Sequence, residues 1–95
     1  MPTKFCGSTV TTAYTQLDSI QGMCDVTFNN PTASAVNIVT GVASLGEAVA
    51  AEGSSQYFPL LPAHVLRVRC DPSKTWVKWT GTTPGSNRYS CIIDW

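Results

Sequence analysis

The chain has 95 residues, of which 43% are hydrophobic and 13% are charged, and its six basic and six acidic residues cancel. This length provides one domain, residues 1–95, with no room for the core of a second domain. Scattered lysines and arginines at zero net charge do not predict the basic patch that nucleic-acid binding needs, and no run approaches the roughly 20 apolar residues of a membrane helix.

Six short segments show the features of β-strands. The clearest is residues 23–29, where Cys24, Val26 and Phe28 alternate with polar residues at the period of a half-buried strand. Turn sequences rich in Gly, Pro, Asn and Asp separate the segments. In chain order, the predicted strands are residues 8–17, 23–29, 35–40, 64–70, 75–80 and 88–95.

Residues 42–56 are harder to assign. The spacing of Leu45 and Val49 fits one or two helical turns, but two glycines bracket a piece that is too short to be stable as an isolated helix. We therefore predict a long surface loop here, with a helical turn as the alternative. Loops of this length in compact domains tend to be functional or mobile.

The succession of short strands and turns predicts an all-β fold. We expect a small antiparallel β-sandwich, jelly-roll-like or immunoglobulin-like, with about six to eight short strands. Inward positions of the alternating strands should form its core. The predicted core residues are Val26, Phe28, Val36, Ile38, Leu66, Val68, Cys91 and Ile93.

The four cysteines are spread along the whole chain and form no CxxC pair, so neither a zinc site nor a redox motif is predicted. No apolar leader follows Met1, and we therefore expect a protein made and kept in a reducing cytosol. In that compartment all four cysteines should be free thiols. The even number of cysteines leaves disulfides as the alternative.

No set of residues suggests catalysis. The only histidine, His64, lies beside a turn, and no serine or cysteine has a recognisable catalytic context. The six carboxylates fall in turns, in the 42–56 segment and at polar strand positions, and no phosphate-binding or calcium-binding loop is present. We expect a protein that is not an enzyme and that has no cofactor and no metal.

Two tryptophans in the strand predicted over 75–80 have opposite parity and should point to opposite faces of a sheet. Trp76 shares its parity with Lys78 and is predicted to face outward, whereas Val77 and Trp79 are predicted to face the core. An outward tryptophan is able to stack on a sugar or a base. Packing in the core and between subunits is the other interpretation.

Several segments of the sequence follow one another in the same order as similar segments in a known group of proteins. They are CDVTFNN (24–30), AVNI (35–38), YFPLLPAHVLRV (57–68), KTWVKWTGT (74–82) and RYSCII (88–93). A pair of strands comes first, a Pro-Leu-x-Pro element follows, and two closing strands end the domain. In this order of elements the chain resembles the small β-sandwich virion proteins of tailed bacteriophages. The likeness covers most of the chain from about Tyr14 on. Ala63 and His64 stand where the group often has Gly-Glu, and the cysteines are not part of its pattern.

The resemblance implies a non-enzymatic structural protein of a virus particle, assembled in the cytoplasm of the host bacterium. Such a protein binds the major capsid protein or other virion subunits as a decoration or cement protein and stabilises the shell. It implies a homo-oligomer or many copies on a lattice, with neither nucleic acid nor a membrane as partner. The alternative is a carbohydrate- or receptor-binding module on a phage tail or fibre, which would use Trp76 and nearby loops.

We predict that residues 42–58, with Pro59 and Pro62 behind them, form the main contact surface. The segment is rich in small residues, and it ends in two aromatics of the kind enriched at interfaces. The alternative is a mobile loop whose aromatics cap the core. The predicted partner-binding residues are Leu45, Glu47, Val49, Glu52, Tyr57, Phe58, Trp76 and Lys78.

Overall fold

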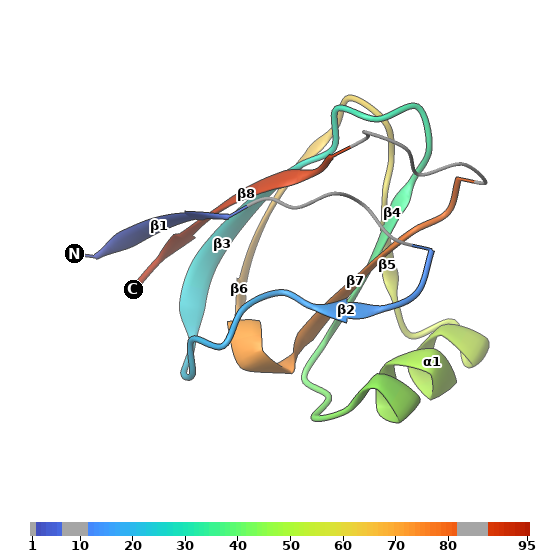
Figure 1. Cartoon of the computed structure of the whole chain (residues 1–95), viewed down its shortest axis with the longest axis horizontal. Helices are drawn as coiled ribbons and strands as arrows, with labels where there is room; N and C mark the ends of the chain where they lie inside the picture. Colours follow the sequence, from blue (N-terminus) through green and yellow to red (C-terminus); the bar gives the residue numbers. More distant parts are fainter. Residues whose placement is uncertain (1, 7–11, 82–87) are drawn as a thin grey trace.

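A computed structural model of the chain shows a β-sandwich of two four-stranded antiparallel sheets (Figure 1). The structure describes residues 2–6, 12–81 and 88–95. Its elements are β1 (Thr3–Cys6), β2 (Thr15–Gln16), β3 (Cys24–Asn29), β4 (Val36–Thr40), α1 (Leu45–Gly53), β5 (Phe58–Leu60), β6 (Val65–Cys70), the 3-10 turn η1 (Pro72–Lys74), β7 (Thr75–Trp79) and β8 (Ser90–Asp94). Sheet 1 has the strand order β1-β8-β3-β6, and sheet 2 has the order β2-β7-β4-β5. The sequence-based prediction of a small antiparallel sandwich is therefore confirmed.

The main core lies between the two sheets and consists of alternate residues of their strands. Six of the eight predicted core residues are buried, and Leu66 and Val68 of β6 are partly buried against them. Val77 and Trp79 of β7 also face this core, as their parity predicts. Burial of each such side chain contributes roughly 1.5–3 kcal/mol, so the space between the sheets is the main source of stability.

Residues 45–53 form the helix α1, so the prediction of a loop is wrong and the helical alternative holds. The side chain of Ser44 caps the helix by accepting a hydrogen bond from the backbone N–H of Glu47, at 3.3 Å. The Glu47 carboxylate in turn accepts from the backbone N–H of Ala43, at 2.9 Å. The first bond satisfies an N–H group that the first turn of a helix leaves free, and the second ties the residue before the cap to that turn.

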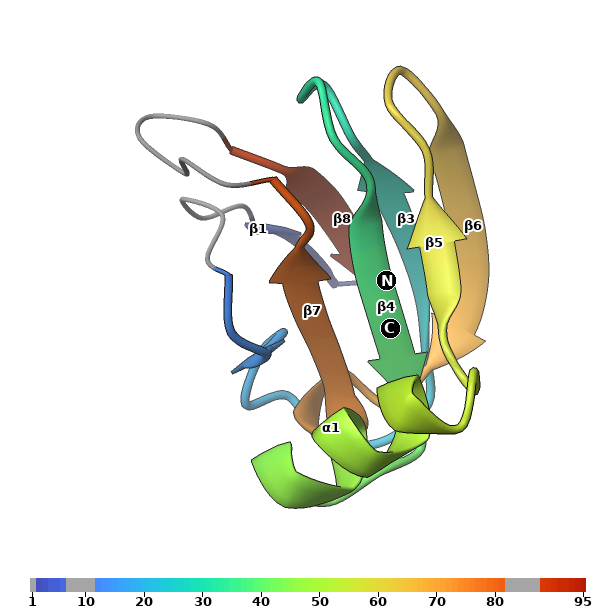
Figure 2. The ribbon, with the colours of Figure 1, turned by 90° about the vertical axis from the view of Figure 1, so that its right-hand side faces the viewer.

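The helix is held by packing on the outer face of sheet 2, where it crosses the ends of β4 and β7 (Figure 2). Ala48 and Ala51 are buried against Val39 and Tyr14 in a second, smaller core, which Trp76 also contacts. Small alanine side chains allow the helix to approach the sheet closely. This packing supplies the stability that an isolated segment of this length lacks.

Two strands, β1 and β5, were not among the six predicted segments. Strand β5 contains Pro59, which is tolerated because β5 is an edge strand and needs no hydrogen bonds on its free side. The strand predicted over residues 8–17 falls partly on residues 7–11, outside the described residues, and only Thr15–Gln16 of the remainder forms a strand. Most of the turn sequence between the strands predicted over 75–80 and 88–95 also lies outside the described residues.

The cysteines divide into two classes, and the prediction of four free thiols is wrong for Cys91, which is disulfide-bonded. The backbone register of β1 and β8 places Cys6 opposite Cys91. Antiparallel pairing thus brings together positions from the two ends of the chain, a proximity that spacing along the sequence does not reveal. Cys24 and Cys70 are free thiols, as predicted, and both are buried.

Candidate functional site

The edge strands β5 and β6 of the two sheets face each other on one side of the sandwich (Figure 2). A crevice opens between the sheets along this edge. Its volume is about 420 Å³, within the range of roughly 300–1,000 Å³ that is typical of small-molecule sites. This edge crevice is lined by Ile38, Thr40, Ser55, Gln56, Tyr57, Phe58, Leu66 and Val68.

The apolar wall of the edge crevice belongs to the core between the two sheets, which solvent reaches at this edge. Phe58 of β5 lies opposite Ile38 of β4 in the register and therefore shares its inward face. Among the described strands, β5 is the last of sheet 2 and is paired on one side only, so Phe58 remains 48% exposed while Ile38 is buried. Leu66 and Val68 supply the facing wall from β6.

The polar rim of the edge crevice is formed by the turn that joins α1 to β5. The backbone N–H of Gln56 donates to the carbonyl oxygen of Ala51 at 2.7 Å, which ties the turn to the end of the helix. Ser55 adopts a left-handed backbone conformation, with φ of 59°, which is uncommon for a residue other than glycine. The resulting turn places Ser55, Gln56 and Tyr57 at the mouth of an otherwise apolar space.

Glu52 fastens α1 to sheet 2 beside this turn. Its carboxylate accepts hydrogen bonds from Lys78 Nζ at 2.7 Å, from the Tyr14 hydroxyl at 2.6 Å and from Asn37 Nδ2 at 3.2 Å. The bonds from Lys78 and Tyr14 hold the pKa of Glu52 below its usual value. Burial, followed by the bond to Glu52, raises the pKa of Tyr14 far above that of a free tyrosine. These hydrogen bonds hold α1, which leads into the turn at the rim of the edge crevice, against sheet 2.

Trp76 faces outward from sheet 2, as predicted, but the chain itself covers it. Its indole N–H donates to the carbonyl oxygen of Val42 at 3.0 Å, and its ring packs against the small core beneath α1. The side chain is only partly exposed. Its edge donor is therefore already used within the chain.

The predicted partner-binding residues separate into two groups. The polar or indole groups of Glu47, Glu52, Trp76 and Lys78 bond within the chain. The other four are exposed apolar residues: Leu45 and Val49 lie one turn apart on α1, and Tyr57 and Phe58 line the edge crevice.

Sequence reasoning missed the other apolar residues of this edge. The alternation predicts Leu66 and Val68 in the core, and they are only partly buried because they form one wall of the crevice. Leu61 and Val65, which flank the turn between β5 and β6, are also exposed. One signal was present in the sequence: Val65 is the apolar residue at an outward position that Arg67 and Arg69 otherwise occupy.

The residues that line the edge crevice include hydroxyls and an amide but no carboxylate, imidazole or amine. A general acid–base step needs such a group within hydrogen-bond reach of the reacting atoms. His64 lies outside this lining, and its Nδ1 is 2.8 Å from the carbonyl oxygen of Pro62. Within the described residues, no three His, Cys, Asp or Glu side chains are grouped to hold a metal ion, and no helix has the length and apolar character to cross a membrane. The lining is suited to contact with an apolar group.

Comparison of the chain with protein-family models, with curated proteins and with solved structures finds no match. A two-sheet sandwich is an architecture that supports many unrelated functions. The function is therefore inferred from the surface described above and from the sequence resemblance.

Proposed function

We propose that this protein is a non-catalytic binding domain that decorates or cements a virus particle through the edge formed by β5 and β6. The observation that carries the proposal is the pair of exposed aromatics, Tyr57 and Phe58, over an uncharged crevice that opens into the core. Together with Leu61 and Val65 they leave one edge of the sandwich lined with large apolar side chains that contact solvent. Apolar surface of this kind, rimmed by polar groups, is characteristic of protein–protein contact.

The edge crevice suits an apolar or aromatic side chain of a partner. Interface residues that contribute most to affinity are commonly aromatic, and they fill pockets from which water is excluded. Ser55 and Gln56 at the rim offer hydrogen-bonding groups for the partner backbone. Leu45 and Val49 on the exposed side of α1 extend the contact beyond the turn.

A role on a particle fits the modest size of this surface. One contact of this size gives limited affinity, but the same contact repeated over a lattice gains strength through avidity. The zero net charge of the chain removes long-range repulsion between neighbouring copies. Both properties favour dense, multivalent binding.

The alternative of a carbohydrate-binding module depended on Trp76 as an exposed stacking platform. In the structure the indole N–H of Trp76 donates to Val42 and its ring packs beneath the helix. Because Trp76 is engaged within the chain, the residue on which the sugar-binding role depended is less able to act as a stacking surface, and we favour the decoration role.

The test compares Phe58→Ala with Phe5→Ala in cosedimentation with purified capsid shells of the virus that encodes the chain. Phe5 is a matched control because it is the same residue type and is 78% exposed, but it lies on β1 of the other sheet. We expect Phe58→Ala to weaken binding about tenfold or more, the effect of losing about 1.4 kcal/mol at a central contact. Phe5→Ala should bind like the wild type.

Thermal unfolding of both variants separates lost contact from lost structure. Phe58 is half exposed, so its removal should change the melting temperature little. Wild-type binding by Phe58→Ala, or the absence of binding by the unmodified domain, overturns the proposal. Point variants are preferable to deletion of residues 44–54, since that deletion removes Glu52 and uncovers the small core on sheet 2.

A further inference from the structure

Cys24 and Cys70 form a pair of buried thiols on neighbouring strands of sheet 1. They lie directly opposite each other in the antiparallel register of β3 and β6, and they are 1% and 3% exposed. Both side chains belong to the core between the sheets. Residues opposite each other in antiparallel strands have Cα atoms about 4.5–5.5 Å apart, within the roughly 4.4–6.8 Å that a disulfide spans.

We propose that Cys24 and Cys70 are the site of a cross-strand disulfide, formed by exchange with a low-molecular-weight disulfide, that joins the edge strand β6 to β3. The thiolate of one cysteine attacks a sulfur of the oxidant, and the first small thiol leaves. The second cysteine then attacks the mixed disulfide and releases the second small thiol. The two cysteines lose two electrons and two protons, which the two released thiols carry. This inference does not depend on the proposed function.

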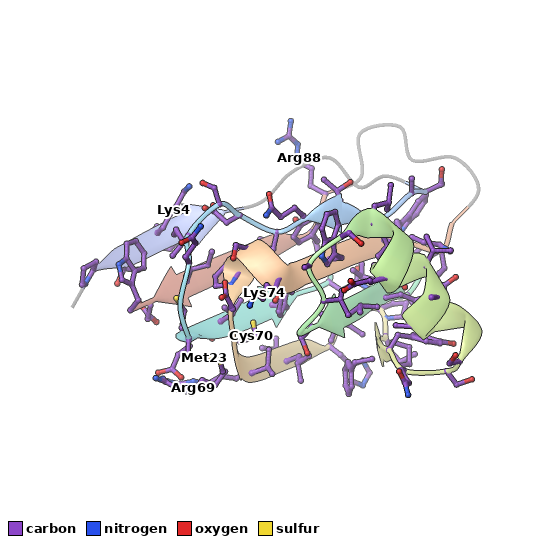
Figure 3. All side chains as sticks on the ribbon, turned by 90° about the horizontal axis from the view of Figure 1, so that it is seen from below. Lys4, Met23, Arg69, Cys70, Lys74 and Arg88 are labelled. Carbon is purple, nitrogen blue, oxygen red and sulfur yellow. The ribbon has the colours of Figure 1, made fainter. Side chains whose placement is uncertain are left out.

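A surface cavity gives the oxidant an approach to Cys70. The cavity has a volume of about 290 Å³ and borders Cys70 directly, with Arg69 and Lys74 in its lining (Figure 3). The lining also holds one carboxylate, that of Asp71, so the two cations leave it with an excess of positive charge. This excess favours the approach of a disulfide that carries carboxylates, such as glutathione disulfide. Cys70 is therefore the cysteine that attacks first, and Cys24 is the resolving partner.

Burial sets the rate of the exchange. It raises the pKa of both thiols, so the reactive thiolate is scarce at neutral pH. Strand β6 is at the edge of sheet 1 and is bonded to β3 on one side only, which makes local opening easier there than in the centre of the sheet. Oxidation should therefore be slow in the folded domain and should accelerate as the pH rises.

The disulfide would fix one wall of the edge crevice. Leu66 and Val68 lie on β6, on the same face as Cys70, and line the crevice opposite Phe58. A covalent link at the end of β6 limits the opening of that strand. The oxidised domain should unfold at a higher denaturant concentration than the reduced one.

The experiment incubates the folded protein with glutathione disulfide at pH values from about 7 to about 9.5, which bracket the ordinary thiol pKa. Acid quenching, alkylation and peptide mapping by mass spectrometry then locate every bond. We expect a peptide pair joined through Cys24 and Cys70, lighter by two hydrogen atoms and without bound glutathione, at a rate that rises with pH. Thiols that stay free throughout, or a glutathione adduct that persists at Cys70, overturn the inference.

Two variants test whether the disulfide forms because Cys24 and Cys70 lie opposite each other. In the double variant Val68→Cys with Cys70→Ala, both thiols remain on the inward face, but the new thiol lies opposite Val26 instead of Cys24. Such diagonal neighbours are about 7–8 Å apart and should not join. In Cys24→Ala, Cys70 has no resolving partner and should retain glutathione. Joining of the diagonal pair as fast as the native pair would show that the register does not direct the reaction.

Discussion

Replacing Glu52 by alanine should destabilise the domain by about 2–4 kcal/mol. The substitution removes the acceptor of three hydrogen bonds, and two of the donors, the hydroxyl of Tyr14 and the amide of Asn37, belong to buried side chains. Hydrogen bonds to charged groups contribute about 1.5–3 kcal/mol each. The side chains of Glu52 and Lys78 are 28% and 25% exposed, so water replaces part of what is lost and the sum is reduced accordingly.

A loss of this size is a large part of the total stability of such a domain, which is on the order of 5–14 kcal/mol. The melting temperature should fall by roughly 10–20 °C. Urea unfolding followed by tryptophan fluorescence measures the change, and Glu47→Ala is a control in the same helix that removes one exposed hydrogen bond. A change below about 0.5 kcal/mol for Glu52→Ala would show that α1 is held by its alanines alone.

The carboxylate of Glu52 should also make the stability of the domain depend on pH in a defined direction. The pKa of Glu52 is lower in the folded than in the unfolded chain, so its contribution is present above the unfolded pKa of about 4.3 and is lost as the pH falls through the folded value. Glu52→Gln should therefore lose less stability between neutral and acid pH than the wild type does. If the stability of the two proteins changes equally with pH, the charge of Glu52 does not contribute to holding α1 on sheet 2.

Three further outcomes follow from individual contacts. Asn30→Ala should lower the free energy of unfolding by about 3–5 kcal/mol, because this fully buried amide donates to the carbonyl oxygen of Leu60 and accepts from the backbone of its own turn. A decrease below about 1 kcal/mol in urea unfolding would contradict this. Gly81→Ala should cost about 1–3 kcal/mol, because the added methyl group overlaps the ring of Trp79, and an unchanged near-ultraviolet circular dichroism spectrum would argue against that contact. Tyr14 should ionise well above the ordinary tyrosine pKa of about 10, so its stabilising effect is lost only as the pH rises beyond that value. Ultraviolet titration should show a late-ionising component that Tyr14→Phe removes, and an unchanged titration curve in that variant would contradict the raised pKa.

Most of the strands were predictable because they bury one face more than the other, which leaves a period of two in the sequence; β4, which α1 covers on its outer face, is buried on both. Strand β3 shows this most clearly: Val26 and Phe28 are buried while Thr27 between them is only partly so. The same rule placed Trp79 in the core and Trp76 on the opposite face. It failed for β1 and β5, which are short edge strands with too few residues to show a period.

Helix α1 was predictable only as an alternative to a loop, because its stability comes from residues far away in the sequence. Ala48 and Ala51 are buried only because Val39 and Tyr14 lie beneath them. The carboxylate of Glu52 finds its donors on β4, β7 and the segment before β2. None of these neighbours is visible in a window of sequence around the helix.

The candidate site was predictable in part. Tyr57 and Phe58 were expected at the surface as possible contact residues, and both are exposed. The crevice beside them was not expected, since Leu66 and Val68 have the pattern of ordinary core residues. Their partial exposure results from the way two edge strands meet, which depends on the assembled sandwich.

Strands β1 and β8 are antiparallel neighbours, and the backbone N–H of Trp95 donates to the carbonyl oxygen of Pro2 at 3.1 Å. Both ends of the described chain therefore emerge together, on the side of the molecule away from α1 (Figure 1). A fluorescent protein or peptide fused to either end would project from that side and leave the β5–β6 edge unobstructed. A particle coated with this domain through that edge would then display the fused cargo on its outer surface, whichever end carried it.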